Sequence, residues 1–211
     1  MKVITPYVEA MHPIDGAVIL SRIEAAGRVC YKSESKITDS SAAAFVRRII
    51  KSGHEAVLEH CNISLKFVCD RGVSHEIVRH RVASYCQEST RYCNYSKGDF
   101  GGEITVIKPL YLTPDTAAYC VWLNASAAAE VAYFKLLDWG CSAQEARAVL
   151  PNSLKTEVVM TANLREWRHF FRLRCSLAAH PQMREVATQA LALLNGLVPV
   201  VFEDIAAEVL K

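Results

Sequence analysis

The chain has 211 residues, of which 51% are hydrophobic and 22% are charged, and its formal net charge is +2. This length suits one domain with a sizeable core, and the composition is that of an ordinary globular protein. The mild charge argues against a dedicated nucleic-acid coat or a polybasic membrane binder, although a local pocket for a phosphate-bearing small molecule is compatible with it.

Eight cysteines are spread along the chain without a CxxC pair. The first ten residues lack the basic flank and apolar run of a secretory signal. Because disulfide frameworks are typical of short secreted chains, we expect reduced, mostly buried cysteines and a cytoplasmic location. The apolar stretch at 117–137 contains Asn124, Glu130 and Lys135, which indicates a buried helix and not a membrane span.

The first half of the chain predicts alternating helices and strands, bounded by capping residues and glycines. In chain order these are a strand at 2–8 weakened by Pro6, a helix from Asp15 to about Cys30, a helix from 39 or 40 to Gly53, a half-buried strand at 61–69 and a short helix at 73–80. Residues 81–102 are polar and aromatic and end in glycines, which is typical of an extended functional loop.

The second half predicts longer helices around two more strands. In chain order these are a strand at 104–108, a helix from 113 to 139, a short helix from a capping box at Ser142 to before Pro151, a strand at 154–162, a helix at 163–174, a helix opening at Pro181 and a final helix at 201–211. There is no βαβ repeat with a GxGxxG turn. We therefore expect an α+β fold, a single domain over 1–211 with a mixed or mostly antiparallel sheet flanked by long helices.

A cluster of cationic and hydroxyl groups occupies residues 79–92, RHRVASYCQESTRY. Three arginines fall within this segment, which contains no lysine, and serines and tyrosines lie between them. Guanidinium groups bind phosphate in a bidentate manner and stay charged at any pH. The pattern favours binding of a phosphorylated ligand over a solvated or interfacial face, which stays open as the alternative.

The same segment resembles the signature of the flavin-dependent thymidylate synthase family, in which RHR is followed by seven residues and a serine. The flanking RGVSHEIVRHR and STRY also resemble that family, as do SGHEAVLEH upstream and RAVLPNSLKTEVVMTANLREWRHFFRLRC with AAHPQMRE downstream. The similarity extends over most of residues 45–190.

The resemblance implies an enzyme that reductively methylates dUMP to dTMP. Methylene-tetrahydrofolate would be the carbon donor, FAD the hydride carrier and NADPH the reductant, in a homotetramer whose sites are shared between subunits. With no Rossmann motif in the chain, the place of the nicotinamide is not indicated.

The resemblance also assigns residues to the two main ligands. For dUMP these are Glu76, Arg79, Gln87, Glu88, Ser89, Thr90, Arg91, Arg174 and, from a neighbouring subunit, Arg147. For FAD these are His54, Ala56 through its backbone, Glu59, Arg79, His80, Arg81, Gln87, Asn163, Arg165 and His169. Glu76 and His169 stand where some relatives carry glutamine and asparagine, so their roles could differ here.

Activation of the uracil ring could use a nucleophile or a charge. None of the cysteines has a recognisable activating partner, Cys86 within the motif included, and Ser89 has no evident base, so we interpret Ser89 as a hydrogen-bond donor to dUMP. The resemblance instead places Arg174 at the edge of the pyrimidine. A fixed guanidinium there would stabilise the negative charge that develops as the ring becomes nucleophilic.

Other functions have weaker support in the sequence. A metal hydrolase would need histidines four apart on a helix, whereas His54 and His60 are six apart, and we expect no metal. A single-stranded nucleic-acid module could use the arginines and tyrosines of 79–95, but the near-neutral charge disfavours it. An inactive flavin-binding relative is a third possibility, although the motif residues are all present.

Overall fold

The computed structural model describes residues 1–210, apart from the side chain of Asp99. Contacts divide the chain into two compact units. Unit 1 comprises Met1–Tyr7, Phe67–Arg79 and Cys86–Val158, and unit 2 comprises Val8–Lys66, His80–Tyr85 and the chain from Val159 onward. The chain passes from one unit to the other within long strands. A single domain over 1–211 stays a prediction.

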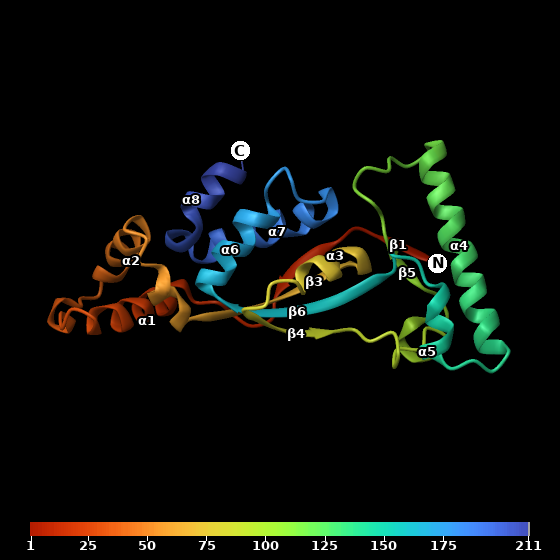
Figure 1. Cartoon of the computed structure of the whole chain (residues 1–211), viewed down its shortest axis with the longest axis horizontal. Coiled ribbons are helices and arrows are strands. Elements are labelled where there is room, and N and C mark those ends of the chain that lie inside the picture. Colours follow the sequence, from red (N-terminus) through yellow and green to blue (C-terminus); the bar gives the residue numbers. More distant parts are fainter. Residues whose placement is uncertain (211) are drawn as a thin grey trace. The chain divides into compact units, whose positions relative to one another are not determined.

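The elements are labelled in Figure 1. The strands are β1 (Lys2–Ile4), β2 (Tyr7–Ala10), β3 (Asn62–Asp70), β4 (Ala83–Gln87), β5 (Thr105–Ile107) and β6 (Lys155–Asn163). The α-helices are α1 (Gly16–Val29), α2 (Ser41–Lys51), α3 (Arg71–Ile77), α4 (Ala117–Asp138), α5 (Ala143–Ala146), α6 (Leu164–Arg174), α7 (Pro181–Leu197) and α8 (Pro199–Val209). Single turns of 3-10 helix are η1 (Glu34–Lys36), η2 (Glu55–His60), η3 (Gly98–Phe100) and η4 (Arg147–Val149).

The strands form two sheets. β1 and β5 pair in parallel, with Val3 opposite Val106. The other four strands form an antiparallel sheet in the order β2-β3-β6-β4. This mixture of sheet and long helices confirms the expected α+β class, while the homotetramer stays a prediction.

Unit 1 has its own apolar core around the β1–β5 pair. Tyr95, Tyr133 and Leu154 pack there against residues of β5. The predicted start of α4 at Thr113-Pro114 is wrong, because Asp115 adopts a left-handed backbone with φ of 65°. The helix is capped instead by the hydroxyl of Thr116, which accepts from the amide of Tyr119 at 3.3 Å.

The burial expected for α4 is also wrong. Only Ser126 and Tyr133 are buried along its length, whereas Val121 is 70% exposed. Apolar composition predicted burial, but the helix contacts the core of unit 1 along one face, and its exposed face carries Asn124 and Lys135 beside Val121. Among the described helices, none is long and apolar enough to cross a membrane.

Unit 2 consists mainly of helices, together with parts of the longer strands β3 and β6. α1 begins as predicted, since the carboxylate of Asp15 accepts from the amides of Ala17 and Val18 at 2.9 and 3.1 Å. α1 packs against α2, and α6 packs against both α7 and α8 (Figure 1). The predicted β3 and α6 are confirmed, with Leu65 and Trp167 fully buried.

The structure differs from two of the predictions about strands and loops. The strand expected at 2–8 is broken into β1 and β2, because Pro6 lacks an amide proton for a continuous ladder. The expected loop at 81–102 contains the strand β4, which pairs with β6. Its polar sequence conceals a strand because it lies at the edge of the sheet, where side chains alternate between partial burial and exposure.

The cysteines are all free thiols. Only Cys61, Cys69 and Cys175 are buried, so the expectation that most would be buried is wrong. The exposed thiols lie on α4, on the edge strand β4 and after α1, where the side chain faces away from the core.

Removing Arg168 is expected to destabilise unit 2. Its fully buried guanidinium donates to Glu55 at 3.1 Å and to Asp204 at 2.6 to 2.8 Å, and also to the carbonyl of Val201. Arg168→Ala leaves Glu55 and Asp204 with only the half-exposed Arg172 as a cation and removes the donor to Val201, so the free energy of unfolding should fall by about 3 kcal/mol. Urea denaturation would measure this change, and an unchanged midpoint would contradict it.

Candidate active site

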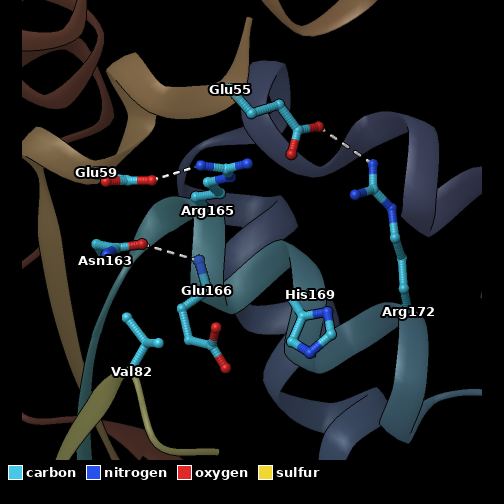
Figure 2. Close-up of a pocket in the computed structure, with 8 residues that line it drawn as sticks. All are labelled: Glu55, Glu59, Val82, Asn163, Arg165, Glu166, His169 and Arg172. Atoms are coloured by element: carbon cyan, nitrogen blue, oxygen red, sulfur yellow. Dashed lines mark hydrogen bonds and ion pairs between the residues drawn. The ribbon is translucent and has the colours of Figure 1, made fainter. Parts of the chain in front are cut away.

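A polar cavity of about 410 Å³ lies in unit 2, beside the N-terminal half of α6. It is lined by Glu55, Glu59, Val82, Asn163, Arg165, Glu166, His169 and Arg172 (Figure 2). Four of these residues, Glu59, Asn163, Arg165 and His169, belong to the flavin set predicted from the sequence. The structure therefore brings together in one pocket residues from η2 and α6 that lie about a hundred positions apart in the chain.

α6 presents this polar face because its other face is anchored. Asn163 caps the helix by accepting from the amide of Glu166 at 2.9 Å. The indole of Trp167 donates to the carbonyl of Ile63 at 3.1 Å and packs against Phe170, and both rings are fully buried. With that face fixed, successive turns of α6 place Arg165 and His169 toward the cavity (Figure 2).

The charged side chains that line the cavity form ion pairs with one another. Arg165 donates to Glu59 at 2.6 Å, and Arg172 lies 3.3 Å from Glu55 (Figure 2). The Arg165 and Arg172 side chains are 52% and 49% exposed, so both can turn toward an anionic ligand. Glu55 also accepts from the buried Arg168, which holds it in place.

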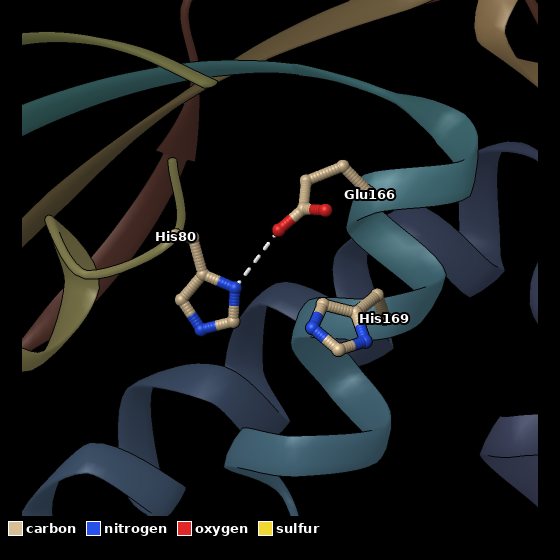
Figure 3. Close-up of side chains that lie close together, drawn as sticks. All are labelled: His80, Glu166 and His169. Carbon is tan, nitrogen blue, oxygen red and sulfur yellow. Dashed lines mark hydrogen bonds and ion pairs between the residues drawn. The ribbon is translucent and has the colours of Figure 1, made fainter. Parts of the chain in front are cut away.

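Beside this cavity, His80 is hydrogen-bonded at both ring nitrogens. Nδ1 lies 2.9 Å from Oε1 of Glu166, and Nε2 accepts from Nε of Arg174 at 3.0 Å. Figure 3 shows Glu166 pointing toward His80, with His169 on the next turn of α6. The side chains of His80 and Glu166 are only 4% and 11% exposed, so water competes little for these bonds.

Surrounding groups hold the His80 ring. It packs edge-on against Phe170, with ring centroids 4.9 Å apart, and its carbonyl accepts from the hydroxyl of Tyr85 at 2.6 Å. Burial lowers the pKa of His80 below its ordinary value; the bond to Glu166 opposes this shift and the charge of Arg174 adds to it. Burial also raises the pKa of Tyr85 to about 12, so its hydroxyl stays a donor.

The His80, Glu166 and His169 side chains have potential metal ligand atoms within 4.8 Å of one another. Both nitrogens of His80 are already hydrogen-bonded, however, and the adjacent guanidinium of Arg174 would repel a cation. The geometry favours a hydrogen-bonded chain over a metal centre, and the expectation that the protein uses no metal stays a prediction.

The remaining residues of the predicted flavin set lie outside this cavity. His54 lines a different cavity in unit 2, together with Arg28, Tyr31 and Arg48. Ala56 and Arg81 are exposed. Their roles toward FAD stay predictions.

In unit 1, consecutive residues predicted for dUMP, from Gln87 to Arg91, begin at the end of β4. The amide of Gln87 donates to Ser74 at 2.9 Å and to Thr156 at 3.3 Å. Both oxygens of Glu88 accept hydrogen bonds, from Tyr95 at 3.2 Å and from Lys155 at 3.0 Å. These contacts tie Gln87 and Glu88 to neighbouring elements, so they hold in place the segment that follows.

That segment carries Ser89, Thr90 and Arg91. The Ser89 hydroxyl accepts from the amide of Arg91 at 3.3 Å, and the Arg91 guanidinium lies 5.5 Å from the centre of the Tyr92 ring. Thr90 is buried and accepts from Arg147 at 3.3 Å. Arg147 was expected to act from a neighbouring subunit; in this structure it already lies beside Thr90 of the same chain, and a role in a neighbour's site stays a prediction.

Arg79 ends the α3 segment of unit 1, where it is exposed, and Glu76 lies one turn earlier, partly buried. We also predict from the sequence that Arg79, Arg91 and the arginines of α6 line one anion-binding cleft. Arg79 and Arg91 belong to unit 1 and the α6 arginines to unit 2, so this common cleft stays a prediction.

Sequence reasoning missed several pocket residues. Glu166 has no role among the residues assigned from the sequence, but its side chain turns to His80. Glu55, Arg172 and Val82 also line the cavity without having been predicted. The signal for Glu166 was present in its position three residues before His169, which places both on one helical face.

The chain was compared with known proteins. The model of the family described as thymidylate synthase complementing protein matches residues 19–200. The flavin-dependent thymidylate synthase of Geobacter sulfurreducens is 36% identical over 186 residues, covering 85% of this chain and 78% of its own length. That of Mycolicibacterium gilvum is 37% identical over 217 residues, covering 94% of this chain and 84% of its own length.

A solved structure supports the fold. The crystal structure of a UMP/dUMP methylase, PolB from Streptomyces cacaoi, bound with 5-Br dUMP, superposes with a TM-score of 0.77 at 24% identity. The match covers 98% of this chain and 97% of that one. The family model and the relatives above 30% identity show that this chain belongs to the flavin-dependent thymidylate synthase family.

Proposed function

We propose that this protein is a flavin-dependent thymidylate synthase that methylates dUMP to dTMP. Methylene-tetrahydrofolate is the carbon donor, FAD the hydride carrier and NADPH the reductant, and no cysteine acts as nucleophile. The observation that carries the proposal is the joint position on α6 of the predicted flavin residues and of Arg174, within a family of thymidylate synthases.

The cavity beside α6 suits part of a flavin dinucleotide. The exposed guanidinium groups of Arg165 and Arg172 match the anionic pyrophosphate, and Asn163 and His169 add polar groups. FAD, when bound, supplies the hydride chemistry, and the protein positions it. Glu59 would hold Arg165 in orientation through their 2.6 Å ion pair.

Activation of the pyrimidine is assigned to Arg174. Its guanidinium is half-buried at the C-terminal end of α6, and the bond from Nε to His80 fixes the plane of the group. An immobilised cation stabilises developing negative charge better than one that must reorganise, because its orientation is set before the reaction. This arrangement supports electrostatic activation of dUMP.

The cysteines give little support for a nucleophile. Burial raises the pKa of Cys61, Cys69, Cys93 and Cys175, so these thiols stay protonated at neutral pH. Cys86 is exposed on β4, and among the described residues no histidine or other base is hydrogen-bonded to it. The Ser89 hydroxyl is bonded to a backbone amide and not to a base.

We place the dUMP phosphate and ribose at the Ser89–Thr90–Arg91 segment, with Arg79 and Arg147 as cations. Glu76 and Glu88 would serve as acceptors or as supports for this segment. Arg147 and Arg91 are exposed, and the neighbouring Lys155 is engaged by Glu88 and Glu157, so the arginines are the cations open to a ligand.

A homotetramer and a cytoplasmic location complete the proposal. α4 exposes Val121 and Val131 at 70% and 52%, and Trp139 follows at 81%. Large apolar side chains exposed in this way are typical of a subunit contact. The free thiols suit a reducing compartment.

The visible absorption spectrum of the purified protein tests the proposal. We expect a yellow protein with a flavin spectrum, a spectral change on adding dUMP, and oxidation of NADPH coupled to dTMP formation when methylene-tetrahydrofolate is present. UMP, which differs from dUMP by one hydroxyl, is the matched control ligand. A colourless protein that cannot be reconstituted with FAD would overturn the assignment.

A further inference from the structure

The hydrogen bonds around His80 determine where its proton lies. An arginine guanidinium carries only donors and does not lose its proton in proteins, so the Nε2 atom of His80 that meets Arg174 must be the acceptor. The ring proton of neutral His80 then lies on Nδ1, where it is donated to Glu166 at 2.9 Å. The opposite tautomer would point an N–H group at the N–H group of Arg174.

We propose that Glu166 is a positioning residue that holds His80 in the Nδ1–H tautomer, so that Nε2 receives and orients the guanidinium of Arg174. The consequence for catalysis rests on the proposed function, whereas the tautomer itself does not. Glu166 acts through His80 and would not touch the substrate.

Because the pair is buried, Glu166 can fix the tautomer of His80. The Glu166 and His80 side chains are almost entirely shielded from water, and Phe170 packs against the ring. Because water cannot replace a lost partner, the proton acceptor at Nδ1 decides which tautomer is populated. An acceptor fixed on the first turn of α6 thereby controls an arginine at the last turn of the same helix.

Protonation of His80 would break the arrangement. A proton on Nε2 would turn the acceptor of Arg174 into a donor, so the guanidinium would lose its fixed orientation. The charged and titratable groups that face the ring are Glu166, His169 and Arg174 from α6, with Tyr85 of β4 bonded to its carbonyl. Since burial and Arg174 lower the pKa of His80, the neutral ring persists below the ordinary pKa of a histidine.

Two substitutions separate geometry from charge. Glu166→Ala removes the acceptor, so both tautomers become populated and kcat should fall about tenfold, the effect of losing one oriented hydrogen bond. Glu166→Gln keeps an oxygen acceptor at the same place and should retain most of kcat at neutral pH. Because the glutamine lacks the charge that stabilises the imidazolium, the acid limb of the pH–rate profile should move to lower pH.

The direct readout is the ¹⁵N spectrum of the full-length protein labelled at histidine, recorded by solid-state NMR with His80→Gln to assign the signal. We expect a protonated Nδ1 and an unprotonated Nε2 in the wild type and in Glu166→Gln, and a mixture in Glu166→Ala. Glu203→Ala is the matched control, because it removes a carboxylate from the exposed ion pair with Arg47; it should leave the spectrum and the rate unchanged.

A wild-type spectrum with the proton on Nε2 would overturn the inference, and so would a Glu166→Ala enzyme with wild-type kcat. Failure of the proposed function is a distinct result. A protein that makes no dTMP but shows the Nδ1–H tautomer, lost in Glu166→Ala, would refute the activity and uphold the role of Glu166. If Glu166→Ala does not fold, the ¹⁵N spectrum and the pH–rate profile of Glu166→Gln still test the role of Glu166.

Discussion

Arg174→Ala should lower dTMP formation about 100- to 1000-fold while FAD stays bound, because one preorganised charge at the reacting ring is lost. The predicted FAD residues that line the cavity, Glu59, Asn163, Arg165 and His169, stay in place when Arg174 is removed, so the flavin spectrum should be preserved. The measurement is single-turnover dTMP formation beside the bound FAD content. Arg174→Lys should recover only part of the rate, since an ammonium group lacks the Nε donor that His80 orients.

Arg47→Ala is the matched control for Arg174. It removes an arginine from an exposed ion pair with Glu203 in the same unit, where such pairs contribute little. Its activity should be near that of the wild type. Near-normal turnover in Arg174→Ala would remove electrostatic activation by this residue as the mechanism.

Arg147→Ala should raise KM for dUMP about 10- to 100-fold and change kcat much less. The expected loss corresponds to one charge-assisted hydrogen bond to a phosphate, about 1.5 to 3 kcal/mol. Arg147 lies 3.3 Å from Thr90 and is exposed, so its removal should not disturb the core of unit 1. Steady-state kinetics at saturating folate and NADPH would separate KM from kcat. A lower kcat with unchanged KM would contradict a binding role.

Lys97→Ala is the control for this effect, because it removes an exposed cation of the same unit outside the assigned site.

Mixed oligomers test whether sites are shared between subunits. If Arg147 and Arg174 reach one site from different chains, mixing Arg147→Ala with Arg174→Ala subunits restores part of the activity. Without sharing, no mixed site contains both arginines and the activity stays low.

Local patterns in the sequence predicted most of the elements and part of the site. Asp15 and Asn163 cap α1 and α6 as expected, and Ser142 forms the predicted capping box with Glu145. The alternation along 61–69 identified β3. These signals are reliable because a cap or an alternation acts between residues that are neighbours in the chain.

The errors occur where the outcome depended on distant partners. β4 was not recognised because an edge strand with polar side chains is defined by its pairing with β6, which no local pattern records. α4 was expected to be buried because its composition is apolar, but composition does not state which face meets a neighbour. Its exposed valines show that burial is a property of the packed unit.

The sequence by itself determined the family, the α+β class and the candidate residues. The reason is that the residues of the RHR-x7-S segment and of the helix at 163–174 stand at fixed spacings, which can be read directly from the sequence. Only the tertiary structure decided that Glu59 lies against Arg165 and that Glu166 and Arg174 meet His80 from opposite sides of its ring. The physical reason is that a hydrogen bond depends on distance in space, and folding sets the distances between groups some ninety residues apart.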